Sequence, residues 1–197
     1  MNIHRTPFSG RNFEYYSEDA LLSGKMGAAM VRGCNEKNVY TYIKHFALND
    51  QETNAIGGAN WCNEQAMREI YLKPFELSVK EGESKAIMTT WSRIGATWAG
   101  ASKPLLQNVL RDEWDLKDLS SQIMRLMGDF QNADQAIAAG NDMMLSSTQR
   151  RSPSMRQRRP SAHEKSLSQH FICSCKQQCA GTCKSGSSGM DLRICCI

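Results

Sequence analysis

A cation and an imidazole stand side by side at the end of an apolar run. The run from Tyr40 to Ile43 is rich in aromatic and β-branched residues and predicts a buried strand, and Lys44 and His45 follow it directly. Side chains at the carboxyl ends of parallel strands converge on a cavity where ligands bind. The pair therefore indicates a site that offers hydrogen bonds to a polar ligand. The alternative is a solvated loop lysine beside a histidine that only packs in the core.

Helices and strands alternate around this strand. Ser17-Glu18-Asp19 can cap a helix whose apolar residues, Leu21 to Val31, recur at helical spacing up to Gly33. The later segments are a helix over 63–80 that Pro74 should kink or divide, a strand over 85–91, a helix over 104–114, a helix over 133–139 and a strand over 142–145. Short links between alternating elements predict parallel strands covered by helices, the α/β class.

Length and composition exclude several classes of protein. The 197 residues are 41% hydrophobic and 22% charged, which is ordinary for a globular protein with one sizeable core or for part of a larger one. No apolar run reaches the roughly 18 residues that a membrane span needs, so no membrane partner is expected. The residues from Met1 to Arg5 carry no apolar signal segment, so a cytoplasmic location is the default expectation.

Charge and cysteine divide the chain near residue 146. Residues 146–197 hold nine Lys or Arg against two Asp or Glu and six of the eight cysteines, whereas residues 1–145 hold 15 against 18. The spacing of Cys173, Cys175, Cys179 and Cys183 lacks the paired C-x-x-C or His partners of zinc modules. The arginines suggest a nucleic-acid arm, but the Ser-, Arg- and Gln-rich composition favours disorder. We therefore expect a disordered basic tail over 146–197, with no metal, no cofactor and no nucleic-acid partner.

Six segments of the chain resemble a known family. They are Asn2-Ile-His-Arg, Gly10-Arg-Asn-Phe-Glu-Tyr-Tyr-Ser-Glu-Asp19, Lys44-His-Phe-Ala, Ala86-Ile-Met-Thr-Thr-Trp-Ser-Arg-Ile-Gly95, Leu110-Arg-Asp-Glu-Trp114 and Ala138-Ala-Gly-Asn-Asp-Met-Met-Leu145. In this order they are similar to the N-terminal domain of glycoside hydrolase family 3, best known for β-glucosidases. The resemblance covers residues 1–145 except 115–127.

The resemblance implies a partial TIM-barrel-like domain and a sugar or β-glucoside as the ligand. Family members remove a terminal β-linked sugar with retention, which needs two carboxyl groups about 5–5.5 Å apart. Arg11, Lys44 and His45 match family positions that hydrogen-bond sugar hydroxyls, and Trp91 stands where a Tyr is frequent. The alternatives are a surface ion pair of Arg11 with Glu14 or Glu18, and ordinary strand packing of Trp91.

The family pattern breaks between Trp114 and Gly128. The family nucleophile is an Asp in a motif similar to Gly-Phe-x-Gly-x-Val-x-Thr-Asp-Tyr, and residues 115–127 instead read as a weakly amphipathic helix. Restoring one base after Trp114 permits the reading Gly-Phe-Lys-Gly-(Phe or Leu)-Val-(Ile or Val)-Thr-Asp-Tyr, whose Asp spans the codons of Gln122 and Ile123. This indicates a pair of compensating frameshifts, the second near Met127, and the tail reads as out of frame from about residue 146.

The displaced frame changes what we expect the chain to do. It lacks the nucleophile motif, the resemblance begins inside the family pattern, and the family acid/base usually comes from a later part of the chain. We therefore expect no catalytic residue and no glycosidase activity in this chain, although its family hydrolyses O-glycosyl bonds. The alternative function is that of a non-catalytic remnant that binds sugar through Arg11, Lys44 and His45.

Overall fold

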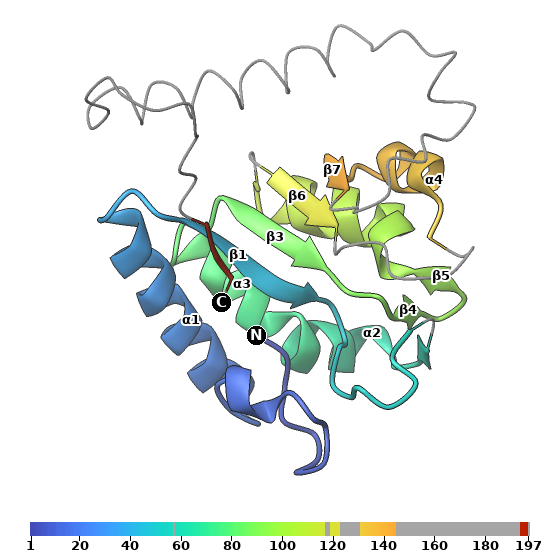
Figure 1. The fold of residues 1–197 in the computed structure, drawn as a ribbon, viewed down its shortest axis with the longest axis horizontal. Helices are drawn as coiled ribbons and strands as arrows, with labels where there is room; N and C mark the ends of the chain where they lie inside the picture. The colour runs from blue at the N-terminus through green and yellow to red at the C-terminus, as the bar shows by residue number, and fades with distance from the viewer. Residues whose placement is uncertain (57, 117–118, 123–130, 145–193, 197) are drawn as a thin grey trace, which may run out of the picture. The chain divides into compact units, whose positions relative to one another are not determined.

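The main sheet has five parallel strands in the order β7-β6-β3-β1-β8 (Figure 1). A computed structural model of the chain describes residues 1–56, 58–116, 119–122, 131–144 and 194–196. The strands are β1 (Tyr40–Phe46), β3 (Ala86–Thr89), β6 (Leu119–Gln122), β7 (Met143–Met144) and β8 (Ile194–Cys196). Ile43 lies opposite Ile87, which in turn lies opposite Ser120 on β6. Parallel strands with helices between them confirm the α/β class.

The helices follow the predicted order. They are η1 (Asn12–Glu14), α1 (Ala20–Asn35), α2 (Glu64–Ala66), η2 (Met67–Tyr71), α3 (Lys73–Lys80), η3 (Ala99–Ala101), η4 (Pro104–Glu113) and α4 (Ala133–Ala138). The Asp19 side chain caps α1 by accepting a 2.5 Å hydrogen bond from the Leu22 amide. The predicted helix over 63–80 divides at Leu72, and Pro74 lies in the first turn of α3, where a missing N–H costs nothing.

Helix α1 packs against α3 through small residues rather than through its large apolar ones (Figure 1). Its buried positions are Ser23, Gly24, Gly27, Ala28 and Val31. A Cβ on Gly24 would lie 2.4 Å from Leu77 Cδ1, so only glycine permits this approach. The predicted helix is confirmed, but most of the large residues that indicated it lie on the other face, where Leu21 is 55% exposed and Met30 49% exposed.

Aromatic rings fix the end of β1 in the core. The Phe46 ring centroid lies 5.2 Å from that of Phe75 on α3 and 5.8 Å from that of Trp114 after η4. Phe46, Phe75 and Ile87 are fully buried. Burial of one such side chain contributes about 1.5–3 kcal/mol. The packing of Phe46 in the core therefore fixes the positions of Lys44 and His45, which precede it in β1.

A small second sheet lies beyond the end of β3. It consists of β2 (Ala59–Asn60), β4 (Arg93–Ile94) and β5 (Thr97–Trp98). Gly95 turns the β4–β5 hairpin with a positive φ of 58°. The Trp98 indole donates to the Thr90 carbonyl over 2.9 Å. This bond ties the hairpin to the segment that follows β3.

Two expectations from the sequence are wrong in part. Leu119–Gln122 forms β6 and is not helical, because its backbone pairs with β3 on one side and with β7 on the other. These main-chain hydrogen bonds do not depend on the period of the apolar side chains. Ile194–Cys196 is not disordered, because this apolar, β-prone run pairs with Tyr40–Tyr42 at the edge of β1. Residues 117–118, 123–127 and 145–193, including the other tail cysteines, lie outside the described residues. The domain division near residue 146 stays a prediction.

Candidate functional site

The end of β1 is irregular where it carries the predicted site residues. Lys44 lies opposite Met88, but Phe46 lies opposite Thr89, so the register shifts at His45. The peptide bonds Lys44–His45 and Phe46–Ala47 are cis. The Asn2 side chain donates to the His45 carbonyl over 3.0 Å and accepts from the His45 amide over 2.9 Å. Asn2 thus satisfies the backbone of His45 in place of a neighbouring strand.

Glu14 brings Lys44 and Arg11 together. The Lys44 ammonium lies 2.9 Å from Glu14 Oε2, and Arg11 Nε lies 2.5 Å from Glu14 Oε1. The Lys44 side chain is 15% exposed and that of Arg11 27% exposed, so both cations reach the surface. Arg11 Nη1 also lies 3.7 Å from Glu52 Oε1. The arrangement presents several N–H donors from two cations at one point beside β1.

His45 lies behind these cations and is only 3% exposed. Its Nδ1 is 2.8 Å from the Tyr15 hydroxyl, and its Nε2 is 3.4 Å from Arg11 Nη1. Burial and then the charges of Arg11 and Lys44 lower the pKa of His45 to about 2. The imidazole is therefore neutral at neutral pH, and both ring nitrogens face protein groups.

Hydrogen bonds connect this cluster to the end of β3. The Asn49 amide donates to the Tyr15 hydroxyl over 3.2 Å and to Glu52 Oε1 over 3.1 Å. Asn49 Oδ1 accepts from the Thr90 hydroxyl over 3.1 Å. Thr90 follows β3 and donates its amide to the Phe46 carbonyl over 2.9 Å. The network thus joins the two strand ends to the segment around η1.

Short-range hydrogen bonds give the η1 segment its shape. The Asn12 side chain accepts from the Ser9 hydroxyl and donates to the Thr6 carbonyl over 2.7 Å. Gly10 has a φ of 84°, which few residues other than glycine adopt. The turn therefore holds Arg11 and Glu14 at fixed positions before Lys44 arrives from β1.

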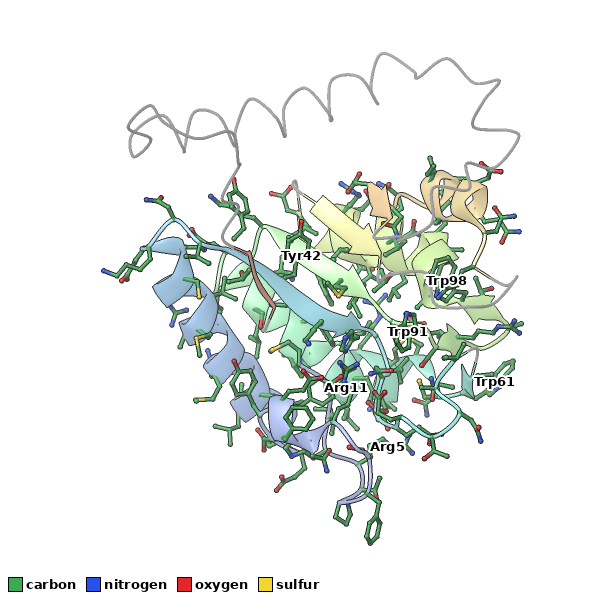
Figure 2. All side chains as sticks on the ribbon, viewed as in Figure 1. Arg5, Arg11, Tyr42, Trp61, Trp91 and Trp98 are labelled. Atoms are coloured by element: carbon green, nitrogen blue, oxygen red, sulfur yellow. The ribbon has the colours of Figure 1, made fainter. Side chains whose placement is uncertain are left out.

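Trp91 directly follows Thr90 and is half-buried. Figure 2 shows Arg11 and Trp91 at the end of the sheet toward which β1 and β3 run. Arg11, Lys44 and His45 thus form one connected group. Trp91 is joined to them through its chain neighbour Thr90 and the amide of Asn49.

Four polar residues of the site were missed by the sequence reasoning: Glu14, Tyr15, Asn49 and Glu52. Glu14 and Tyr15 stand in the segment from Gly10 to Asp19, whose polar residues are the signal that could have found them. The sequence suggests an ion pair of Arg11 with Glu14 only as the alternative to a functional role for Arg11. The structure shows that pair within the site itself.

Asp50 is a further buried carboxyl beside this network. It is 6% exposed, and Arg5 Nη1 lies 3.6 Å from its Oδ2. Within the described part of the chain, neither carboxylate oxygen has a hydrogen-bond partner. Burial raises the pKa of Asp50 to about 6, against the opposing charge of Arg5.

A cavity of about 690 Å³ lies elsewhere in the molecule. Its described lining includes Arg93, Trp98, Lys103 and Gln135, from β4, β5, the segment before η4, and α4. None of the four predicted site residues lines it. Within the described ranges, no group of three or more His, Cys, Asp and Glu side chains is placed to hold a metal, and no helix has the length and apolar character that a bilayer span requires.

Known proteins are similar to this chain in sequence and in fold. A model of the glycosyl hydrolase family 3 N-terminal domain matches residues 1–169. Beta-glucosidase A of Butyrivibrio fibrisolvens is 42% identical over 145 residues, which cover 74% of this chain and 17% of that protein. Beta-glucosidase B of Emericella nidulans is 41% identical over 143 residues, again 17% of its length. The chain thus spans about a sixth of these relatives.

Solved structures agree with the sequence matches. Beta-glucosidase 3B from Thermotoga neapolitana, in complex with α-D-glucose, superposes with a TM-score of 0.70 at 34% identity over 90% of this chain and 23% of its own. The Bifidobacterium adolescentis GH3 β-glucosidase superposes with a TM-score of 0.78 at 28% identity over 96% and 28%. The N-terminal domains of these proteins are TIM-barrel-like, and the parallel sheet of this chain matches part of such a domain. The chain belongs to glycosyl hydrolase family 3, with its residues 1–169 matching the N-terminal domain.

Proposed function

We propose that the site at the end of β1 binds the terminal sugar of a β-glucoside, in the way that retaining exo-glycosidases of the β-glucosidase type bind it. The observation that carries the proposal is the convergence of Arg11 and Lys44 on Glu14, within 2.5 and 2.9 Å, at the surface beside β1. A sugar offers a ring of hydroxyls, and positively charged N–H donors form its stronger hydrogen bonds. One solved relative, beta-glucosidase 3B from Thermotoga neapolitana, was obtained in complex with glucose and with glycerol.

Each site residue has a distinct part in this proposal. Arg11 and Lys44 reach the surface and donate to hydroxyls, while His45 supports them from the buried side. Glu14 neutralises the two cations and also offers its oxygens as acceptors for a hydroxyl proton. Trp91 provides an aromatic face on which the apolar face of a sugar ring can stack.

We further propose that this chain binds the sugar without cleaving it. Retention requires a carboxylate that attacks the anomeric carbon. β6 lies beside β3 at the place in the sheet where the family nucleophile strand is due, but it ends at Gln122 and has no carboxylate from Leu119 to Gln122. The displaced reading frame puts the family Asp across the codons of Gln122 and Ile123, directly at the end of this strand.

Calorimetry with glucose and methyl β-glucoside tests the binding proposal. We expect saturable heat with the chain as it stands, and a loss of that heat in Arg11→Met. Lys85→Met is the matched control, because Lys85 lies over the Tyr40 ring at the opposite end of β1 and also loses a cation. Absence of heat and of thermal stabilisation by either sugar would overturn the binding proposal. Hydrolysis of an aryl β-glucoside above a no-protein control would overturn the claim of inactivity.

A further inference from the structure

In the cluster around Arg11, two neighbouring residues of the η1 segment pair with two neighbouring residues of β1. Glu14 contacts Lys44, and the next residue, Tyr15, contacts His45. The ion pair between Glu14 and Lys44 is partly exposed, whereas Tyr15 is 7% exposed and His45 3% exposed. The proposed function uses His45 as a support for the two cations and assigns no part to Tyr15.

The donors around His45 determine where its proton resides. A guanidinium only donates hydrogen bonds, so His45 Nε2, which faces Arg11 Nη1 at 3.4 Å, must accept. A neutral imidazole whose Nε2 accepts carries its proton on Nδ1. Nδ1–H then donates to the Tyr15 oxygen over 2.8 Å. The geometry therefore selects one of the two neutral tautomers.

The surroundings of Tyr15 keep its oxygen in place. The Asn49 amide donates to the same oxygen over 3.2 Å, and Thr90 holds Asn49 from the end of β3. Burial raises the pKa of Tyr15 above its ordinary value, so the phenol stays protonated and neutral at physiological pH. The Tyr15 oxygen is thus anchored from β3 while it receives the proton of an imidazole on β1.

We propose that Tyr15 is a positioning residue, which fixes His45 as the Nδ1–H tautomer so that Nε2 accepts from Arg11 and aims its guanidinium at the sugar. The aim at the sugar rests on the proposed function, whereas the tautomer does not. Glu14 orients the guanidinium through Nε and His45 orients it through Nη1, so the remaining N–H groups of Arg11 are presented in a fixed direction.

The first experiment reads the tautomer directly. We expect the imidazole ¹⁵N shifts of His45, assigned by their loss in His45→Gln, to show a protonated Nδ1 and an unprotonated Nε2 in the unchanged chain. Tyr15→Phe removes the acceptor and leaves a buried N–H unsatisfied, so the shifts should move toward the other tautomer. Tyr40→Phe, which removes a phenol oxygen at the far end of β1, should leave them unchanged.

The second experiment reads the consequence for the sugar. Glucose affinity should fall about 5- to 10-fold in Tyr15→Phe and remain unchanged in Tyr40→Phe. A protonated Nε2 in the unchanged chain overturns the inference even if Tyr15→Phe fails to fold, and so do ¹⁵N shifts that Tyr15→Phe leaves in place. An unchanged glucose affinity in a Tyr15→Phe protein with altered shifts overturns the aiming role. If the unchanged chain has the expected tautomer but binds no glucose, the proposed function fails and the assignment of the tautomer stands.

Discussion

The carboxyl ends of β1 and β6 flank β3 in the same sheet but differ in what they present. β1 delivers Lys44 and His45 among partners from the η1 segment and from Asn2, whereas β6 ends at Gln122 after Leu-Ser-Ser. β6 is nevertheless paired on both sides, through Leu119–Ser121 with β3 and through Ser121–Gln122 with β7. A strand can therefore keep its place in the sheet whatever side chains it carries, because the ladder uses only main-chain groups.

The largest expected effect comes from giving the end of β6 a functional side chain, as the end of β1 already has. Replacing residues 115–124 with Gly-Phe-Lys-Gly-Phe-Val-Ile-Thr-Asp-Tyr places an Asp directly after β6. We expect this variant to attack a dinitrophenyl 2-fluoroglucoside, whose leaving group needs no protonation, and to become covalently labelled. A nucleophile commonly contributes roughly 10⁴-fold or more in rate, so labelling should rise from none to stoichiometric in mass spectrometry.

The matched control for this variant carries Ala in place of the restored Asp. It should fold as the Asp variant does and remain unlabelled. Labelling of both variants would place the reactive group elsewhere. No labelling of an Asp variant that binds glucose would contradict the assignment of the strand end after β6 as the nucleophile position.

A second change tests whether the stability of β6 depends on its main-chain hydrogen bonds or on its side chains. Ser121 pairs with Met88 on one side and with Met143 on the other. Ser121→Pro removes a ladder donor and should lower the free energy of unfolding by about 3 kcal/mol. Urea denaturation measures this loss, and Ser121→Val, which keeps the amide and favours a strand, serves as the control. Equal destabilisation by both would mean that β6 depends on its side chains.

The corresponding change at β1 should affect binding more than folding. Lys44→Gln removes the ammonium that lies 2.9 Å from Glu14 and leaves a neutral polar side chain that is one bond shorter. A hydrogen bond to a charged group contributes about 1.5–3 kcal/mol, so glucose affinity should fall roughly 10- to 100-fold in calorimetry. Lys25→Gln, which breaks an exposed pair with Glu81, should leave the affinity unchanged. A loss of thermal stability with unchanged affinity would identify the Lys44 pair as structural.

Local sequence predicted the two strand ends to different extents. β1 was predictable because its aromatic and β-branched run ends in Lys44 and His45. β6 was not, since Leu119–Gln122 has little strand propensity and becomes a strand through its neighbours. Glu14 lies 30 residues before Lys44 in the chain, so no local pattern could show that they meet.

The packing of α1 marks another limit of sequence reasoning. The apolar periodicity correctly indicated a helix, but it indicated the wrong face. Close contact with α3 requires glycine at Gly24 and Gly27, so the face that packs most closely carries the weakest hydrophobic signal. Steric fit between two helices depends on the partner helix as well, and therefore cannot be obtained from the period of one segment.

The smallest expected effect concerns a buried carboxyl that follows β1 in the chain, whereas the residues of β6 include no carboxyl. Asp50 follows β1 by four residues and is buried without a hydrogen-bond partner among the described residues. Because burial raises its pKa from 3.8 to about 6, its contribution to stability is full below pH 3.8 and is lost as the pH rises through 6. Asp50→Asn should therefore raise the free energy of unfolding by about 1–2 kcal/mol at pH 7.

The pH dependence of this gain separates charge from packing. Urea denaturation of both proteins at pH 7 and pH 4 should show a much smaller gain at pH 4, because there Asp50 is protonated in the folded state and already partly protonated in the unfolded state. His45 does not disturb the comparison, since its lowered pKa destabilises both proteins equally as the pH falls below 6.5. An equal gain at both pH values would show that the amide packs or hydrogen-bonds better than the carboxyl. No gain at either would show that the ion pair with Arg5, at 3.6 Å, already compensates for the burial of Asp50.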